Sequence, residues 1–195
     1  MPDLPIRAEF TSAGALARCD AGGLSIIQYP ASELEPGPHQ VWLRWRGAGG
    51  HRALGLTGPA GGGLVGRTDD GVTLRGHHED VDWELAWDQP AGGGRFGWWL
   101  RVTNRGASPV ELDAVWTLDA ALTPWEALRR NEFYVSQYLD LTPLPDDGSL
   151  VMAVRQNMPG DAHPWLALGA TRRVVAWCTD ALQLRPVPGT GLDLG

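Results

Sequence analysis

The stretch Asn131–Leu144, NEFYVSQYLDLTPL, decides how the rest of this chain is interpreted. Read with a period of two, it separates into an apolar face and a face of polar and aromatic side chains. The apolar face carries Phe133, Val135, Leu139 and Leu141, and the other carries Glu132, Tyr134, Ser136, Tyr138 and Asp140. The pattern predicts a long strand whose polar face is able to stack on a sugar ring and bond its hydroxyls. An ordinary solvated strand face fits the pattern equally well.

The segment that follows is predicted to pair with this strand. Pro143–Gly148 contains two prolines and predicts a turn, and Ser149–Asn157 returns as the partner strand. A turn centred on Pro145 and Asp146 places Arg155 opposite Ser136. This register gathers the candidate carbohydrate-contacting residues on one face: Glu132, Tyr134, Tyr138, Asp140 and Arg155.

Short alternating segments separated by glycine and proline make up most of the remaining chain. The clearest is Val81–Trp87, in which every second residue is apolar. The expected strands are Leu24–Gln28, Gln40–Arg46, Arg52–Leu56, Val72–His77, Val81–Trp87, Phe96–Asn104, Val110–Ala121, Trp165–Ala170 and Arg173–Thr179. Three consecutive strands from Val81 to Ala121 predict an antiparallel meander inside an all-β sandwich. We expect the tryptophans to fill the core of the sheets rather than to serve as sugar platforms.

One helix is predicted. In Thr123-Pro124-Trp125-Glu126 the threonine stands at the cap position, with proline in the first turn and glutamate at the third helical position. This is the capping-box arrangement. The helix is expected to continue for one or two turns to Arg130, where the positive charge of two arginines suits the helix dipole.

The charge and hydropathy of the chain limit its partners. With a net charge of −7 and no lysine among its 195 residues, the chain lacks the basic field that attracts nucleic acid. No apolar run approaches the roughly 20 residues that span a bilayer. The first residues, MPDLPIRAEFTSAG, have neither the basic nor the apolar region of a secretory signal. We expect a soluble, cytoplasmic protein without nucleic-acid or membrane partners.

The sequence shows no motif for a metal or cofactor. The glycine-rich segments Gly47–Gly50 and Gly58–Gly63 lack the lysine and hydroxyl of a phosphate-binding loop, so we interpret them as loops. Cys19 and Cys178 lie far apart and outside any metal-ligand spacing. A pair of buried, reduced thiols is the expected state of these cysteines.

The densest group of titratable residues is His77-His78-Glu79-Asp80. Adjacent histidines on a strand point to opposite faces, so they cannot share one metal without a bend. One alternative makes His77 or His78 a general acid in a sugar-isomerising site, with Glu132 as the base. No spacing in the sequence requires these residues to lie close together.

Taken in order, five segments resemble the N-terminal domain of glycoside hydrolase family 94, particularly that of the β-1,2-oligoglucan phosphorylases. They are Glu33–Leu43 (ELEPGPHQVWL), Asn131–Leu144, Val154–Asn157, His163–Trp165 and Thr179–Gln183. The resemblance implies a galactose-mutarotase-like antiparallel β-supersandwich with at most one or two short helices. It would occupy residues 1–185 as a single domain, with residues 186–195 as a linker or truncated end.

The resemblance also implies a separate (α/α)6 barrel that carries the catalytic aspartate and the phosphate site. No residue of this chain matches that aspartate motif, so we expect no catalytic residue and no cofactor in it. The expected partners are a barrel domain in a longer or separate chain, a β-linked gluco-oligosaccharide and a second copy of the chain. Two alternatives stay open: a stand-alone aldose mutarotase or epimerase, and an oligomerisation module.

Overall fold

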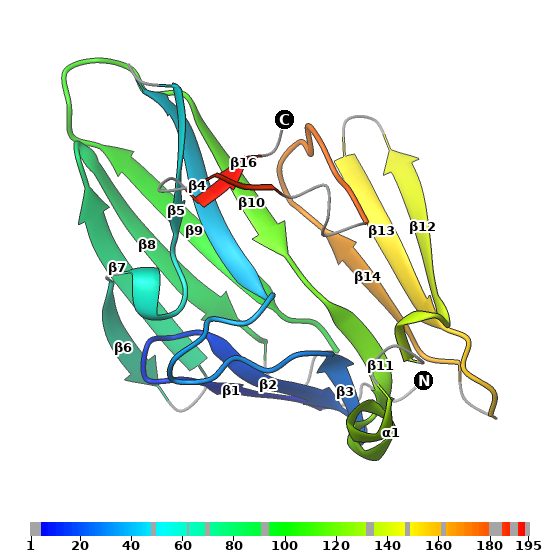
Figure 1. Ribbon diagram of the computed structural model, residues 1–195. Coiled ribbons are helices and arrows are strands. Elements are labelled where there is room, and N and C mark those ends of the chain that lie inside the picture. The colour runs from blue at the N-terminus through cyan, green and yellow to red at the C-terminus, as the bar shows by residue number, and fades with distance from the viewer. Residues whose placement is uncertain are drawn as a thin grey trace.

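The fold is known from a computed structural model. It describes residues 5–47, 50–61, 63–68, 71–90, 94–131, 135–146, 149–160, 163–179, 185–187 and 191–193. Every strand pair among these residues is antiparallel, which confirms the predicted all-β class. Figure 1 shows β6–β9 on the left of the molecule and β12–β14 on the right, with β4, β5 and β10 between them.

The strands of the described segments form five sheets. In spatial order, the first contains β1 (Ile6–Phe10), β2 (Leu16–Ala21), β3 (Leu24–Ile27) and β11 (Ala120–Pro124). The second contains β10 (Leu112–Thr117), β4 (Gln40–Gly47) and β5 (Gly50–Gly55). The third contains β6 (Leu64–Thr68), β7 (Gly71–His78), β8 (Val81–Asp88) and β9 (Gly97–Asn104). The fourth contains β12 (Leu139–Asp146), β13 (Ser149–Gln156) and β14 (Trp165–Gly169), and the fifth β15 (Arg185–Val187) and β16 (Gly191–Asp193).

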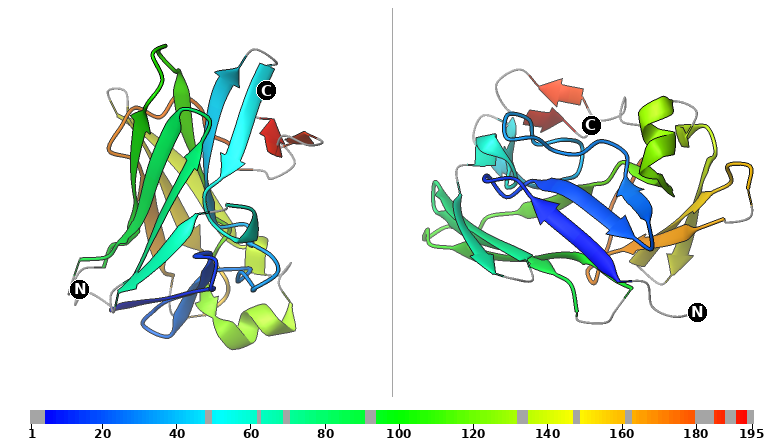
Figure 2. Two further views of the ribbon diagram at one scale, coloured as in Figure 1. Left: turned by 90° about the vertical axis from the view of Figure 1, so that its left-hand side faces the viewer. Right: turned by 90° about the horizontal axis from the view of Figure 1, so that it is seen from below.

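Short helical elements accompany these sheets. The 3-10 helix η1 (Pro59–Gly61) follows β5, and helix α1 (Trp125–Arg130) follows β11. Figure 2 shows β15 and β16 beside β4 and β5, and β16 packs next to β5. None of the helices in the described segments is long and apolar enough to cross a membrane.

Alternation of apolar residues produces one core shared by several sheets. On β8, Val81, Trp83, Leu85 and Trp87 are all buried, as their spacing predicted. Trp98 and Leu100 of β9 pack against the same cluster, together with residues of β2, β4 and β13. Several tryptophans therefore do fill the core, because their rings bury a large apolar area between facing strands. Not all of them do, since Trp99 and Trp165 remain exposed.

The meander begins two strands earlier than predicted, at β6, and ends one strand sooner, at β9. Strands β6 to β9 are neighbours in order, but β10 pairs with β4 and not with β9. Arg44 Nη2 of β4 lies 2.7 Å from Asp113 Oδ2 of β10, and this ion pair joins the two strands. The predicted strand Val110–Ala121 is in fact two strands, β10 and β11, that belong to different sheets.

The strand predicted over Asn131–Leu144 is wrong over Val135–Tyr138, and residues 132–134 lie outside the described residues. Val135 and Ser136 are helical, and the strand β12 begins only at Leu139. Val135 is fully buried with Ala121 and Leu128 in a second, small apolar cluster. Its carbonyl accepts from Tyr138 N (3.3 Å), so local turn bonds replace the expected ladder. Burial against α1 and β11 thus overrides the period-two pattern.

The turn predicted at Pro143–Gly148 is also wrong over Pro143–Asp146, because β12 continues through both prolines to Asp146, and residues 147–148 lie outside the described residues. Strand β12 is an edge strand, where a proline can occupy a position that needs no ladder donor. The segment Arg173–Thr179 was predicted as a strand, but it has no regular structure.

Helix α1 forms where it was predicted, yet without the predicted cap. Pro124 precedes the helix and no side chain caps it, while Thr123 is buried at the end of β11. The cysteine prediction holds in part: both thiols are free, but Cys19 is buried and Cys178 is exposed. Burial raises the pKa of the Cys19 thiol to about 12, with a smaller effect from the charge of Asp20.

Candidate functional site

An exposed row of three side chains crosses the sheet β12–β13–β14. Asp140 of β12 lies directly opposite Arg155 of β13, and Arg155 lies directly opposite Trp165 of β14. Directly opposed residues of antiparallel strands project from the same face. All three residues are exposed, and the exposed fraction of Trp165 is 67%. We call this set, Asp140, Arg155 and Trp165, the polar-aromatic row.

The other face of the same sheet explains why the row points outward. Val154 and Gln156, the neighbours of Arg155 on β13, are buried. Leu139, Met152, Leu166 and Leu168 pack against the main core from this face. Because successive strand residues alternate between faces, burying these side chains commits the row to the outer face.

A buried amide holds the end of β13 in place next to the row. Gln156 Nε2 donates to the carbonyl oxygens of Ala121 (2.9 Å) and Val135 (3.2 Å). Its Oε1 accepts from Met158 N at 3.0 Å. These bonds tie β13 to β11 and to the turn before β12, so the backbone that carries Arg155 is fixed from two sides.

The carboxylate of the row is oriented by a neighbouring amide. Asn157 Nδ2 donates a hydrogen bond to Asp140 Oδ2, and Asn157 N donates to the carbonyl of Tyr138 at 2.8 Å. Asp140 keeps further lone pairs for a ligand, since a carboxylate has about four acceptor sites. The guanidinium of Arg155 offers a planar set of donors beside it.

The predicted pairing register of β12 and β13 is wrong by four residues. Arg155 faces Asp140 and not Ser136, since both strands continue up to residues 146 and 149. A shift of four leaves each side chain on its original face, because the side-chain period is two. The predicted juxtaposition of Asp140 and Arg155 on one face is therefore confirmed, although the register behind it was wrong.

The other candidate residues are distributed as follows. Tyr138 lies in the turn immediately before β12 and is partly buried. Glu132 and Tyr134 fall outside the described residues, so their part in the site stays a prediction. The structure adds Trp165, which was assigned to the core with the other tryptophans. Its neighbours Leu166 and Leu168 alternate with Trp165 and Ala167, and this alternation was a signal that Trp165 faces outward.

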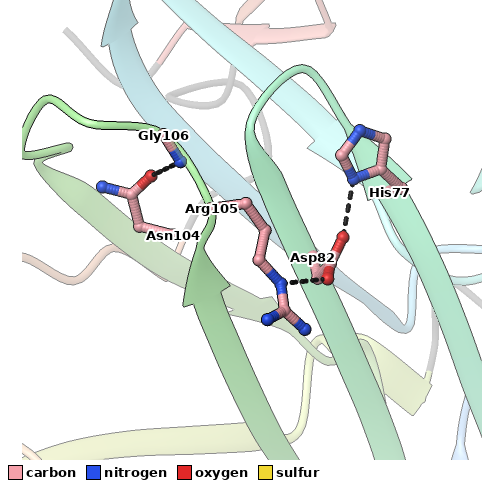
Figure 3. Close-up of polar contacts among 5 residues, drawn as sticks. All are labelled: His77, Asp82, Asn104, Arg105 and Gly106. Atoms are coloured by element: carbon pink, nitrogen blue, oxygen red, sulfur yellow. Dashed lines mark hydrogen bonds and ion pairs between the residues drawn. The ribbon is translucent and has the colours of Figure 1, made fainter.

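The two adjacent histidines do point in different directions. His77 Nδ1 lies 2.6 Å from Asp82 Oδ1 on the exposed face of β7–β8, and Arg105 Nε donates to Asp82 Oδ2 at 2.6 Å (Figure 3). These two hydrogen bonds hold the pKa of Asp82 below its usual value, and the bond from Arg105 has the larger effect. The ring of His78 instead packs against Trp45, with 5.1 Å between ring centroids. His77 therefore has Asp82 as its carboxylate partner, while the predicted partner Glu132 lies outside the described residues.

No group of three or more metal-ligating side chains occurs within the described ranges. What the polar-aromatic row offers is an aromatic surface, a guanidinium donor and an oriented carboxylate acceptor on one open face. These are groups for binding a polar ligand that also has an apolar face.

Comparison with known proteins gives one relative with a described activity. A segment of 89 residues is 33% identical to the 1,2-beta-oligoglucan phosphorylase of Listeria innocua serovar 6a. The match covers 45% of this chain and 8% of that protein, so the chain spans only a small part of the relative's length. This similarity connects the chain with a carbohydrate-active enzyme.

A sequence family matches nearly the whole chain. The family is described as the SOGP N-terminal domain, and the match extends over residues 9–188. It therefore includes every strand from β2 to β14, the polar-aromatic row among them. With that coverage, the chain belongs to the SOGP N-terminal domain family.

Proposed function

We propose that this chain is a non-catalytic, carbohydrate-associated domain of a glycoside-phosphorylase-like protein of the glycoside hydrolase family 94 kind. In this proposal it packs against a catalytic barrel carried elsewhere and contacts a β-linked gluco-oligosaccharide through the polar-aromatic row. The supporting observation is the register that puts Asp140, Arg155 and Trp165 in one exposed row, in a chain of the SOGP N-terminal domain family.

The chemistry of the row suits a sugar. The two faces of a glucose ring are lined by C–H groups and its edge by hydroxyls, so it needs an aromatic plane together with hydrogen-bonding groups at the rim. Trp165 supplies the plane, and Arg155 and Asp140 supply a donor and an acceptor one and two strands away, about 5 and 10 Å across the sheet. Ala153 and Ala167 flank the row on the same face, and their small side chains leave the surface above them open.

Titration calorimetry with a β-1,2-linked gluco-oligosaccharide tests this proposal. We expect the wild-type chain to release heat on binding, and Trp165→Ala to weaken the affinity by about tenfold or more, because a central aromatic contact is lost. Trp177→Ala is the matched control: Trp177 is 53% exposed but lies in the irregular segment 173–179 and belongs to no strand. Its affinity should stay within about twofold of wild type.

Two outcomes would contradict the proposal in different ways. Equal affinities of wild type and Trp165→Ala would remove the row as the contact site. Release of a sugar phosphate from the glucan by this chain with inorganic phosphate would show that the chain is catalytic, against the accessory role in this proposal.

A further inference from the structure

A second exposed tryptophan lies on a different sheet. Trp99 of β9 is 43% exposed, whereas its neighbours Trp98 and Leu100 pack into the core. Leaving an indole ring on the solvent side of a strand forgoes the apolar burial that most tryptophans obtain. The polar-aromatic row on β12–β14 does not account for this ring, because Trp99 belongs to the sheet β6–β9 at the other side of Figure 1.

The ring of Trp99 is held on one side and open on the other. The guanidinium carbon of Arg101 lies 4.8 Å from the centroid of the ring, within the range of a cation–π contact. Two residues earlier on the same face of β9 stands Gly97, and no described atom lies within 4 Å of where its Cβ would be. Arg101 thus fixes the ring while the side above Gly97 stays accessible.

A row of directly opposed residues, most of them small, extends from Trp99 across the whole sheet. Trp99 lies opposite Ala86, Ala86 opposite Thr73, and Thr73 opposite Gly66. A Cβ at Gly66 would meet only Thr73 O, at 3.7 Å, so nothing described covers this end of the row. Four strands spaced about 4.8 Å apart make the row about 14 Å long.

Charged side chains line one side of this row, and two of their arginines are paired with carboxylates. Glu84 lies opposite Arg101 and Arg75, and Arg75 Nε is 2.5 Å from Glu84 Oε2. In the next row Asp82 bonds both His77 and Arg105 (Figure 3). Each guanidinium still has unused N–H donors and each carboxylate unused lone pairs. A ligand that uses them without disturbing these pairs is rich in hydroxyls and carries no charge.

We propose that the outer face of β6–β9, centred on Trp99, is a second binding site for a neutral oligosaccharide. Trp99 stacks on a sugar ring above Gly97, the hydroxyls bond Arg101, Glu84 and Arg75, and the chain of sugars extends over Ala86 and Thr73. An anionic ligand is disfavoured, since Arg75 and Arg105 are already paired with carboxylates, Arg101 lies over the Trp99 ring, and the whole chain has a net charge of −7. The choice of a β-linked glucan as the probe rests on the proposed function, but the site itself does not.

The indole N–H signals of the 15N-labelled chain test this site, because each tryptophan gives its own signal. Trp99→Phe, Trp165→Phe and Trp125→Phe each remove one signal and so assign it. Trp125 is the matched control: it is 39% exposed, but it lies on helix α1 and not on a sheet face. The labelled chain is titrated with a β-1,2-linked gluco-oligosaccharide and, separately, with inorganic phosphate.

We expect the Trp99 signal to move with the oligosaccharide and not with phosphate, while the Trp125 signal stays in place. Glu84→Gln should weaken the binding measured at Trp99 by about tenfold and leave that at Trp165 unchanged. Movement of the Trp99 signal alone supports this site and removes the row on β12–β14. Movement of the Trp165 signal alone overturns this site and leaves the proposed function intact. Absence of movement at either ring overturns both, and a response of Trp99 to phosphate overturns the neutral ligand.

Discussion

Replacing Gly76 with alanine is expected to destabilise the fold by about 2–3 kcal/mol, the cost of overpacking a filled core. Gly76 of β7 lies directly opposite Trp83 of β8. A Cβ at this position would lie 2.3 Å from Trp83 Cζ2, and the ring is only 3% exposed. The far edge of the same ring already lies close to Gly63, where an added Cβ would be 2.6 Å from Trp83 Cη2, so the ring has little space on that side. Urea denaturation followed by circular dichroism measures the loss.

Gly66→Ala is the control for this substitution. Gly66 stands on the neighbouring strand β6, but its Cβ would point to the outer face and meet only Thr73 O at 3.7 Å. The backbone angle φ is not positive at either glycine, so alanine causes no backbone strain. We expect Gly66→Ala to be neutral or slightly stabilising, since alanine loses less backbone entropy on folding. Equal stability of the two variants would mean that the Trp83 ring does not lie over Gly76.

The stability of the fold is expected to fall by about 2 kcal/mol between about pH 7.5 and pH 5 because of one buried histidine. His39 is 1% exposed and lies between Trp98 and Trp116. Burial lowers its pKa to about 4 from 6.5, and the nearby backbone of Thr117 opposes the shift only in part. His39 Nε2 accepts from Trp98 Nε1 at 3.2 Å, so a proton added there would replace this bond by a buried charge.

The sign of this effect follows from proton binding. Between about pH 6.5 and pH 4 the unfolded chain binds a proton at His39 that the folded chain excludes, so acid favours unfolding. Asp119 acts in the opposite direction, because burial raises its pKa and the folded state then holds its proton more firmly. The pKa of Glu33 is lowered, mainly by its hydrogen bonds from Ser12, and its contribution is lost only at more acidic pH.

Urea denaturation of wild type, His39→Gln and His163→Gln at both pH values measures this dependence. We expect His39→Gln to be less stable at about pH 7.5 but to lose most of the pH dependence. His163 is exposed, so its variant should follow the wild-type curve. An unchanged pH dependence in His39→Gln would contradict the assignment to His39.

The parts of the fold that the sequence predicted are those where burial forces a local pattern. Val81–Trp87 alternates because its inner face must fill the core, and the strand forms as expected. The return strand Ser149–Gln156 was found for the same reason. Pairing between distant segments was not predicted, because nothing in the sequence of β10 states that its partner is β4 and not β9.

In the candidate site too, local alternation predicted which face a residue occupies, but packing between distant segments could not be predicted. The period of two placed Asp140 and Arg155 on one face. This prediction is correct although the predicted register was wrong by four residues, because an even shift keeps each side chain on the same face. The pattern failed at Val135, where packing against Leu128 favours a helical turn over a strand. Trp165 was missed because tryptophan is usually a core residue, and only the two leucines that follow it on alternate positions indicate its outward direction.

Whether the outer face of β12–β14 binds carbohydrate can be seen in a crystal structure of the chain with a bound β-1,2-linked gluco-oligosaccharide. We expect a sugar ring stacked on Trp165, with hydroxyls within hydrogen-bond distance of Arg155 and Asp140. An ordered oligosaccharide bound elsewhere on the chain, with Trp165 exposed to solvent and in contact with no sugar, would contradict this expectation.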